Sequence, residues 1–236
     1  QKKQILLSLP LEFPKFEPGW VWLSGAGPGD TGLLTLHAFN ALQQADIIVY
    51  DALVGEGILK LVSSECQMEY AGKRGGKPSI KQKDISLRLV ELAQKGKRVL
   101  RLKGGDPFIF GRGGEEAMYL AKAGIPFRII PGISAGTGGL AYAGIPLTHR
   151  DFNSAVTFLT GHGMAGELPE SHNWDAIAQG SPVIVMFMAT KYLGDIAIRL
   201  MRNGRSPEEP VAVITKASLP GQYVLETKLG TCAQDV

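Results

Sequence analysis

The stretch Arg101-Leu-Lys-Gly-Gly-Asp-Pro-Phe-Ile-Phe-Gly-Arg-Gly-Gly-Glu-Glu116 decides the fold class of this chain. It begins within a strand-like run at Val99 to Leu102 and contains five glycines. Because glycine loses much backbone entropy on folding, such a density is usually kept for close backbone approach or unusual dihedral angles. A second glycine-rich loop, Gly25-Ala-Gly-Pro-Gly-Asp30, follows another strand-like run. Two glycine loops at the carboxyl ends of two strands predict a small-molecule cleft in an α/β sheet.

The segments around these loops alternate between strand and helix patterns. Ser79-Ile-Lys-Gln82 resembles a capping box that opens a helix, and Gly96 is placed to end that helix. Such alternation favours a mainly parallel sheet covered by helices. Strands are expected at residues 21–24, 46–50, 99–102 and 127–130, and helices near 33–42, 79–96 and 114–123.

The pattern restarts after the segment Ile145-Pro-Leu-Thr-His149. Four further strands are expected at residues 155–160, 183–187, 211–214 and 223–226, with one clear helix at 191–203. We therefore expect two α/β domains with a cleft between them. The predicted divisions are a lead-in segment at 1–19, an N-terminal domain at 20–148 and a C-terminal domain at 149–236.

Composition excludes several classes of protein. The 236 residues are 44% hydrophobic, and 25 Lys plus Arg face 22 Asp plus Glu, too balanced a charge for a dedicated nucleic-acid binder. No apolar run approaches the ~18 residues needed to span a bilayer, and no secretory leader pattern is present. Cys66 and Cys232 are isolated, which favours free thiols, and the histidines lack metal-ligand spacing. We expect a cytoplasmic protein without membrane, nucleic-acid or metal binding.

The first glycine loop invites a dinucleotide-binding interpretation because it follows a strand and precedes a helix. Its spacing is GxGxG rather than GxGxxG, and Pro28 removes an N–H group where a pyrophosphate would need one. A nicotinamide enzyme is therefore disfavoured. A plain tight turn and a loop that brings backbone close to a ligand both stay open, and the second glycine loop favours the ligand.

Acidic residues in and after the second loop allow more than one interpretation. The carboxylate of Asp106, held extended by the following proline, is able to bind a ribose or amino group, or only to cap neighbouring amides. Glu115 and Glu116 are adjacent carboxylates, as in an acid/base pair. Their place in the first turn of the next helix has a simpler cause, since acids there favour the helix dipole.

Basic residues cluster at Lys73-Arg-Gly-Gly-Lys77, where a solvated helix face is the usual explanation. The two glycines after Lys73 and Arg74 indicate instead a loop at a strand end, and its fixed positive charge suits an anionic substrate. Among the histidines, only His149, beside Arg150 at the predicted domain junction, is worth watching, and a structural role is favoured there.

Several segments, taken together and in order, closely resemble the tetrapyrrole methylases, also called class III methyltransferases. The resemblance runs from about Trp20 to the end of the chain, and the long second loop is its most specific part. The segments GGKPSIKQKDIS and GSPVIVMFMA look like the single-function form that feeds cobalamin synthesis. The motifs that carry the resemblance are GAGPGD, VYDALV, AGKRGGK, RLKGGDPFIFGRGGEE, PGISAG, AYAGIPLTHR and VTFLTGH.

The resemblance implies a two-domain α/β fold that differs from the usual Rossmann methyltransferase. It also implies that S-adenosylmethionine binds between the domains, that no metal takes part, and that the enzyme is a homodimer. The implied reaction transfers methyl groups to ring carbons 2 and 7 of uroporphyrinogen III, giving precorrin-2 through precorrin-1.

Individual residues acquire roles from the same resemblance. Asp51 matches the position proposed as proton acceptor, and Lys73 matches the proposed donor. The carboxylate arms of the substrate are expected to meet arginines, which bind carboxylates bidentately, at Arg74, Arg112 and Arg150. Cofactor contacts are implied at Pro28, Gly104, Gly105, Asp106, Ile109, Ser134, Ala135, Met188 and Ala217.

The sequence also departs from the family pattern. Thr31 stands where proline is common, Ala189 follows Met188 where glycine is usual, and Ala217 replaces a common glycine. If these positions approach the cofactor, the added methyl groups require a slight loop adjustment. The alternatives are another methylase of the same fold (a later precorrin methylase, diphthine synthase or an rRNA methylase), a nicotinamide-dependent oxidoreductase and a non-catalytic tetrapyrrole carrier.

Overall fold

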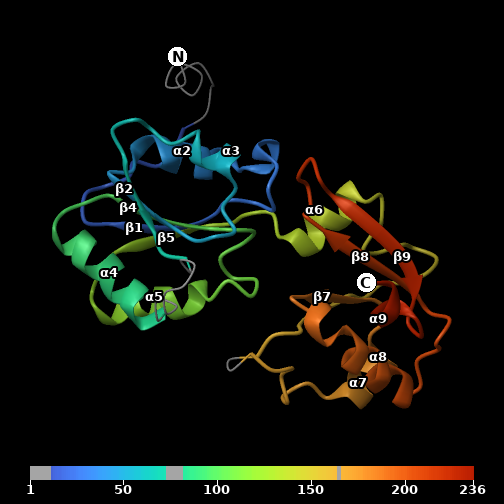
Figure 1. Cartoon of the computed structure of the whole chain (residues 1–236). Coiled ribbons are helices and arrows are strands. Elements are labelled where there is room, and N and C mark those ends of the chain that lie inside the picture. Colours follow the sequence, from blue (N-terminus) through green and yellow to red (C-terminus); the bar gives the residue numbers. More distant parts are fainter. Residues whose placement is uncertain (1–11, 73–81, 164–165) are drawn as a thin grey trace. The chain divides into compact units, whose positions relative to one another are not determined.

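The computed structural model describes residues 12–72, 82–163 and 166–236. The chain divides into two compact units, Gln1–Ser134 and Ala135–Val236, each with its own sheets and helices (Figure 1). The predicted domain boundary, between residues 148 and 149, lies later than this division. The helix at Ala135–Tyr142 explains the difference, because its residues Gly136 and Gly139 pack on other residues of the second unit.

The first unit is built on a five-stranded sheet in the order β3-β2-β4-β1-β5, and all its pairings are parallel. The predicted parallel sheet is therefore confirmed. Its strands are β1 Val21–Gly25, β2 Ile47–Tyr50, β3 Gln67–Tyr70, β4 Val99–Lys103 and β5 Phe127–Ile130. Its helices are the 3-10 turn η1 Thr31–Leu33, α2 Leu36–Gln44, α3 Glu56–Leu59, α4 Gln82–Gln94 and α5 Gly113–Lys122.

Helices cover both faces of this sheet, with α2 and α3 on one face and α4 and α5 on the other (Figure 1). Side chains alternate between the faces along each strand. Leu100 and Leu102 of β4 pack in the α2/α3 core, whereas Val99 packs in the α4/α5 core. Arg101 and Lys103 share the period of Val99, so two buried cations point toward α4 and α5.

The sequence prediction missed α3 and β3. The edge strand β3 reads Gln-Met-Glu-Tyr, with its first two residues exposed, and so lacks the apolar alternation that marks a half-buried strand. The predicted end of α4 is confirmed, because the helix stops at Gln94 and Gly96 has a φ of +74°. The predicted capping box at Ser79 lies mainly outside the described residues.

The second unit holds two small sheets, a parallel pair β6-β7 and an antiparallel pair β8-β9. Its strands, all predicted, are β6 Thr157–Thr160, β7 Ile184–Phe187, β8 Pro210–Thr215 and β9 Tyr223–Lys228. Its helical elements are α6 Ala135–Tyr142, α7 Trp174–Gly180, η2 Thr190–Tyr192, α8 Leu193–Arg202 and α9 Cys232–Asp235. Helices α7, α8 and α9 pack around Trp174, Ile196, Leu200 and Cys232.

The sequence also failed to predict helix α6. Its run Ala-Gly-Thr-Gly-Gly reads as a loop because glycine disfavours helix interiors. Close packing explains the glycines: a Cβ on Gly136 would lie 2.4 Å from the ring of Phe187. Throughout the described part of both units, none of the helices combines the length and apolar character needed to cross a membrane.

Candidate active site

The loops that follow β1, β4 and β5 meet through backbone contacts at the carboxyl edge of the parallel sheet. The N–H of Gly27 donates to the carbonyl of Gly105 at 3.2 Å, and the N–H of Gly105 donates to the carbonyl of Gly27 at 2.8 Å. A Cβ on Gly25 would lie 2.4 Å from that Gly105 oxygen, and a Cβ on Gly132 only 2.1 Å from it. The glycines therefore serve the predicted close backbone approach. We call Gly25, Gly27, Gly105 and Gly132 the glycine junction.

Asp106 ties the same loops together through its side chain. One carboxylate oxygen accepts a hydrogen bond from the N–H of Phe108 at 2.8 Å, and the other accepts from the N–H of Gly132 at 3.0 Å. The structure therefore supports the amide-capping interpretation. Each oxygen has further acceptor capacity, because a carboxylate offers about four lone-pair sites.

Replacing Gly132 by alanine is expected to lower the free energy of unfolding by about 1–3 kcal/mol, the usual cost of overpacking. The new methyl group would meet backbone atoms of Gly105 and Gly25, which have no rotamer with which to move aside. Urea denaturation followed by circular dichroism measures this loss.

Gly114→Ala is the matched control for Gly132→Ala. A Cβ on Gly114 meets no atom within 4 Å, and the residue lies in α5, where alanine is favoured by up to about 1 kcal/mol. Equal stability of the Gly132→Ala variant and the wild type would contradict the close packing.

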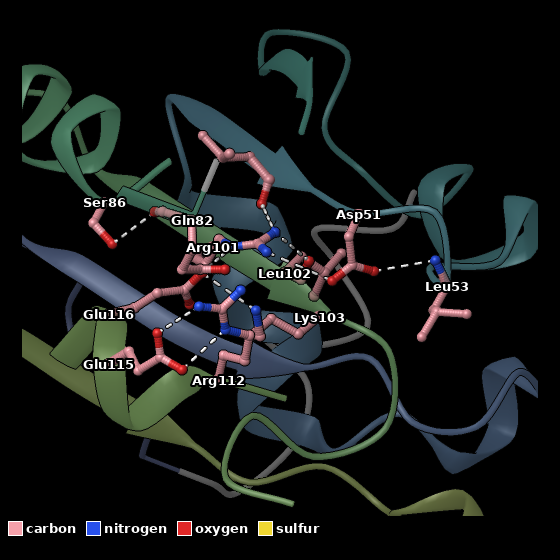
Figure 2. Close-up of polar contacts among 11 residues, drawn as sticks. Asp51, Leu53, Gln82, Ser86, Arg101, Leu102, Lys103, Arg112, Glu115 and Glu116 are labelled. Atoms are coloured by element: carbon pink, nitrogen blue, oxygen red, sulfur yellow. Dashed lines mark hydrogen bonds and ion pairs between the residues drawn. The ribbon is translucent and has the colours of Figure 1, made fainter. Parts of the chain in front are cut away.

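A buried network of charged side chains lies between β4 and α5 (Figure 2). Oε1 of Glu116 accepts hydrogen bonds from Nε of Arg101 at 3.0 Å, Nζ of Lys103 at 3.3 Å and Nε2 of Gln82 at 2.8 Å. The Glu116 side chain is fully buried. Its Oε2 atom has no hydrogen-bond partner among the residues that the structure describes.

Burial sets the electrostatics of this network. Desolvation lowers the pKa of the Lys103 amine below its usual value, and the charge of Arg101 lowers it further, whereas Glu116 opposes both. Glu116 does lie in the first turn of its helix, as predicted, but its main contacts are with the two cations. This network was not predicted from the sequence. The pattern that indicates it is the pair of cations at alternate positions of the apolar strand Val99-Leu-Arg-Leu-Lys103.

Asp51 lies at the solvent-facing end of this network, immediately after β2. One of its carboxylate oxygens accepts from the N–H of Leu53 at 3.1 Å, and the other is 3.6 Å from Nη2 of Arg101 (Figure 2). Its side chain is 24% exposed. The carboxylate is thus oriented by the protein and still partly exposed to solvent. Lys73 and Arg74, the other predicted residues of this region, lie outside the described residues.

Arg112 is exposed and already engaged by a carboxylate. Its backbone is left-handed, with a φ of +58°, and its guanidinium binds both oxygens of Glu115, at 2.9 and 2.7 Å. This pair lowers the pKa of the Glu115 carboxyl. A substrate carboxylate would therefore compete with Glu115 for Arg112.

The remaining predicted cofactor contacts of the first unit lie close to the junction in sequence. Pro28 follows Gly27 and is half-buried, Ile109 is half-buried in the loop before α5, and Ser134 is buried at the end of the unit. The structure brings the loops that carry these residues to one edge of the sheet. Gly104 belongs to the same edge, where a Cβ on it would lie 2.5 Å from Cβ of Leu53.

Four predicted site residues belong to the second unit. Ala135 begins α6, Arg150 is exposed, and Met188 follows β7 with a left-handed φ of +54°. Ala217 lies between β8 and β9. Opposing glycines leave room for the methyl groups by which this chain departs from the family pattern. A Cβ on Gly139 would lie 2.7 Å from the Ala217 methyl, and one on Gly161 would lie 3.1 Å from that of Ala189.

Fold and site together define a two-unit α/β protein with a loop-built site at the edge of a parallel sheet. The family model of Tetrapyrrole (Corrin/Porphyrin) Methylases matches residues 21–233. The chain therefore belongs to the tetrapyrrole methylase family, and the predicted fold class is confirmed. Among the described residues there is no cluster of side chains suited to a metal ion.

Two relatives show how the chain compares in sequence. It is 65% identical over 223 residues to a uroporphyrinogen-III C-methyltransferase from Sinorhizobium sp., covering 94% of this chain and 80% of that protein. It is 49% identical over 228 residues to siroheme synthase 1 from Yersinia enterocolitica, covering 97% of this chain but 47% of that protein. The chain thus spans about half the length of this siroheme synthase.

Solved structures give the same picture. Uroporphyrin-III C-methyl transferase from Thermus thermophilus complexed with S-adenyl homocysteine matches with a TM-score of 0.79 and 35% identity, over 91% of this chain and 85% of that one. The native form of the Thermus protein matches with a TM-score of 0.80 and 37% identity, over 91% and 90%. Membership of a methylase family argues against the nicotinamide-dependent and non-catalytic alternatives.

Proposed function

We propose that this chain is an S-adenosylmethionine-dependent uroporphyrinogen-III C-methyltransferase, which forms precorrin-2 through precorrin-1 by methylating ring carbons 2 and 7. The observation that carries this proposal is the 65% identity to the Sinorhizobium enzyme over 94% of the chain. The S-adenyl homocysteine in the Thermus relative supports the choice of cofactor. We further propose that the enzyme is a cytoplasmic homodimer that supplies cobalamin synthesis.

The residues at the glycine junction fit an adenosyl cofactor. Gly104 and Gly105 present half-buried backbone without side chains at the carboxyl end of β4. Asp106 offers carboxylate oxygens with free acceptor capacity for hydroxyl or amino groups. We assign cofactor contacts to these three residues and to Pro28, Ile109, Ser134, Ala135, Met188 and Ala217.

When bound, S-adenosylmethionine supplies an electrophilic methyl group on its sulfonium. The chain contributes mainly by holding the accepting ring carbon in line with that group, and such positioning supplies up to about 7–11 kcal/mol. Asp51 then accepts the proton that the methylated macrocycle loses, and we assign Lys73 as proton donor. Arg74, Arg112 and Arg150 bind the carboxylate arms of the substrate.

The direct test is an anaerobic incubation with uroporphyrinogen III and methyl-labelled S-adenosylmethionine, with the product identified by mass. We expect a gain of two methyl groups. The absence of transfer by a protein that binds the cofactor would overturn the substrate assignment and favour a later precorrin methylase of the same fold.

Cofactor choice is tested separately by thermal unfolding. We expect S-adenosylhomocysteine at 100 times its Kd to stabilise the folded protein by about 2.7 kcal/mol, because only the folded state binds it. NADH at the same concentration should leave Tm unchanged. Stabilisation by NADH and not by S-adenosylhomocysteine would contradict the proposed cofactor.

The proposed homodimer is tested by light scattering of the purified protein. The mass of one chain is 25.3 kDa, and we expect twice this value across a tenfold range of concentration. A mass of one chain throughout that range would contradict the dimer.

A further inference from the structure

The Arg101 guanidinium connects the buried network to the partly exposed carboxylate of Asp51. Its Nε atom donates to Glu116, and its Nη1 atom donates to the carbonyl oxygens of Val49 at 3.2 Å and Leu102 at 3.3 Å. The remaining nitrogen, Nη2, faces Oδ2 of Asp51 at 3.6 Å. The three nitrogens of the fork therefore have different partners, contributed by α5, by β4 itself, and by β2 and the residue that follows it.

These contacts fix the direction of the guanidinium. Its nitrogens lie in one rigid plane, so the bonds at Nε and Nη1 determine where Nη2 points. The side chain is 3% exposed, which leaves it no alternative position in solvent. Asp51 receives a second restraint from the N–H of Leu53, so both of its oxygens have a protein contact.

Asp51 also balances the charges of the buried network. Arg101 and Lys103 bring two cations into the buried network, and Glu116 provides a single buried anion. The ionised carboxylate of Asp51 supplies the second negative charge at the network's solvent-facing end. Charge balance and geometry thus lead to the same pairing between Arg101 and Asp51.

Resting on the proposed function, we propose that Arg101 is a positioning residue that holds the Asp51 carboxylate ready to accept the proton that the methylated macrocycle loses. The methylated carbon carries a carboxylate arm and has no hydrogen, so the bond that breaks is an N–H or meso C–H bond of the cationic ring system. Its electron pair neutralises the ring system, and the proton forms an O–H bond with Asp51. Arg101 does not touch the reacting atoms. Glu116 anchors Arg101 from the opposite side.

A double-mutant cycle between Arg101→Lys and Asp51→Asn tests this role. Lysine keeps the positive charge beside Glu116 but has no planar fork to reach Asp51 as well. We expect Arg101→Lys to lower kcat about tenfold, a part of the ~10²–10⁴ that a general base contributes. KM and the Kd of S-adenosylhomocysteine should stay unchanged, and the double variant should be no slower than Asp51→Asn alone.

Arg98→Lys is the matched control, because Arg98 forms a similar pair with Asp46 at the other end of β2 and β4. It should leave kcat unchanged. If the Arg101→Lys and Asp51→Asn effects instead multiply in the double variant, Arg101 acts independently of Asp51 and the proposal is overturned. The wild-type methylation assay decides the proposed function by itself, so the two failures are distinguishable.

Two further measurements remain decisive if Arg101→Lys does not fold. Asp51→Glu keeps a carboxylate base but moves it by one methylene from the position set by Arg101, so kcat should fall about tenfold within the same ~10²–10⁴ range. Full kcat in Asp51→Glu would overturn the proposal. Without any ligand, hydrogen exchange at the Leu53 amide should be faster in Asp51→Glu than in wild type, and an unchanged rate would count against the positioning.

Discussion

Glu116→Gln is expected to lower the free energy of unfolding by about 3–5 kcal/mol, the cost of removing one partner from a buried ion pair. Glu116 is the fully buried anion between Arg101 and Lys103. A glutamine of nearly the same size leaves both cations without their buried counter-charge. The measurement is urea denaturation at neutral pH, with the folded state confirmed by near-ultraviolet circular dichroism.

The neighbouring carboxylate provides the control for this experiment. Glu115 lies in the same helical turn, but it is exposed and pairs with Arg112 at the surface. Exposed pairs are worth about 0–1 kcal/mol, so Glu115→Gln should change stability by no more than that. Equal losses for the two variants would mean that burial does not set the energy of the Glu116 network.

Asp51→Asn is expected to lower kcat by a factor of ~10²–10⁴, the usual contribution of a general base. The amide has the same shape as the carboxylate and still accepts from the N–H of Leu53, but it does not take up a proton at neutral pH. Single-turnover measurement of labelled methyl transfer reports this loss directly. The Kd of S-adenosylhomocysteine should be unchanged, because Asp51 is assigned to proton transfer alone.

Asp46→Asn is the corresponding control. Asp46 precedes β2 and pairs with Arg98, whereas Asp51 follows β2 at the edge that carries the glycine junction. Methyl transfer should therefore be unaffected by Asp46→Asn. Full turnover by Asp51→Asn would show that another group accepts the proton.

Local patterns were sufficient to predict most of the fold. The strands β1, β2 and β4 are apolar runs at the buried centre of the sheet, and the edge strand β5 is predicted because it keeps apolar side chains at Phe127, Ile129 and Ile130. The edge strand β3 and the glycine-rich helix α6 were missed for opposite reasons. The first has exposed positions that need no apolar residue, and the second needs glycine for contact with distant side chains.

The candidate site was predicted less completely, because its contacts join residues far apart in the chain. Glycine density at residues 104–114 correctly indicated close backbone approach, but the partner glycine at 132 becomes visible only when β1, β4 and β5 lie side by side. The role of Glu116 depended in the same way on two cations of β4. Spacing along the sequence carries no information about such pairings across a sheet.

The glycine junction also limits how this edge of the sheet can be redesigned. Three loops share contacts in which no side chain intervenes, so a substitution in one loop has no compensating substitution in another. Variation in ligand preference must therefore come from side chains beside the junction, such as the exposed Leu53 and Phe108. A library built for altered specificity should keep the glycines constant and diversify those neighbours.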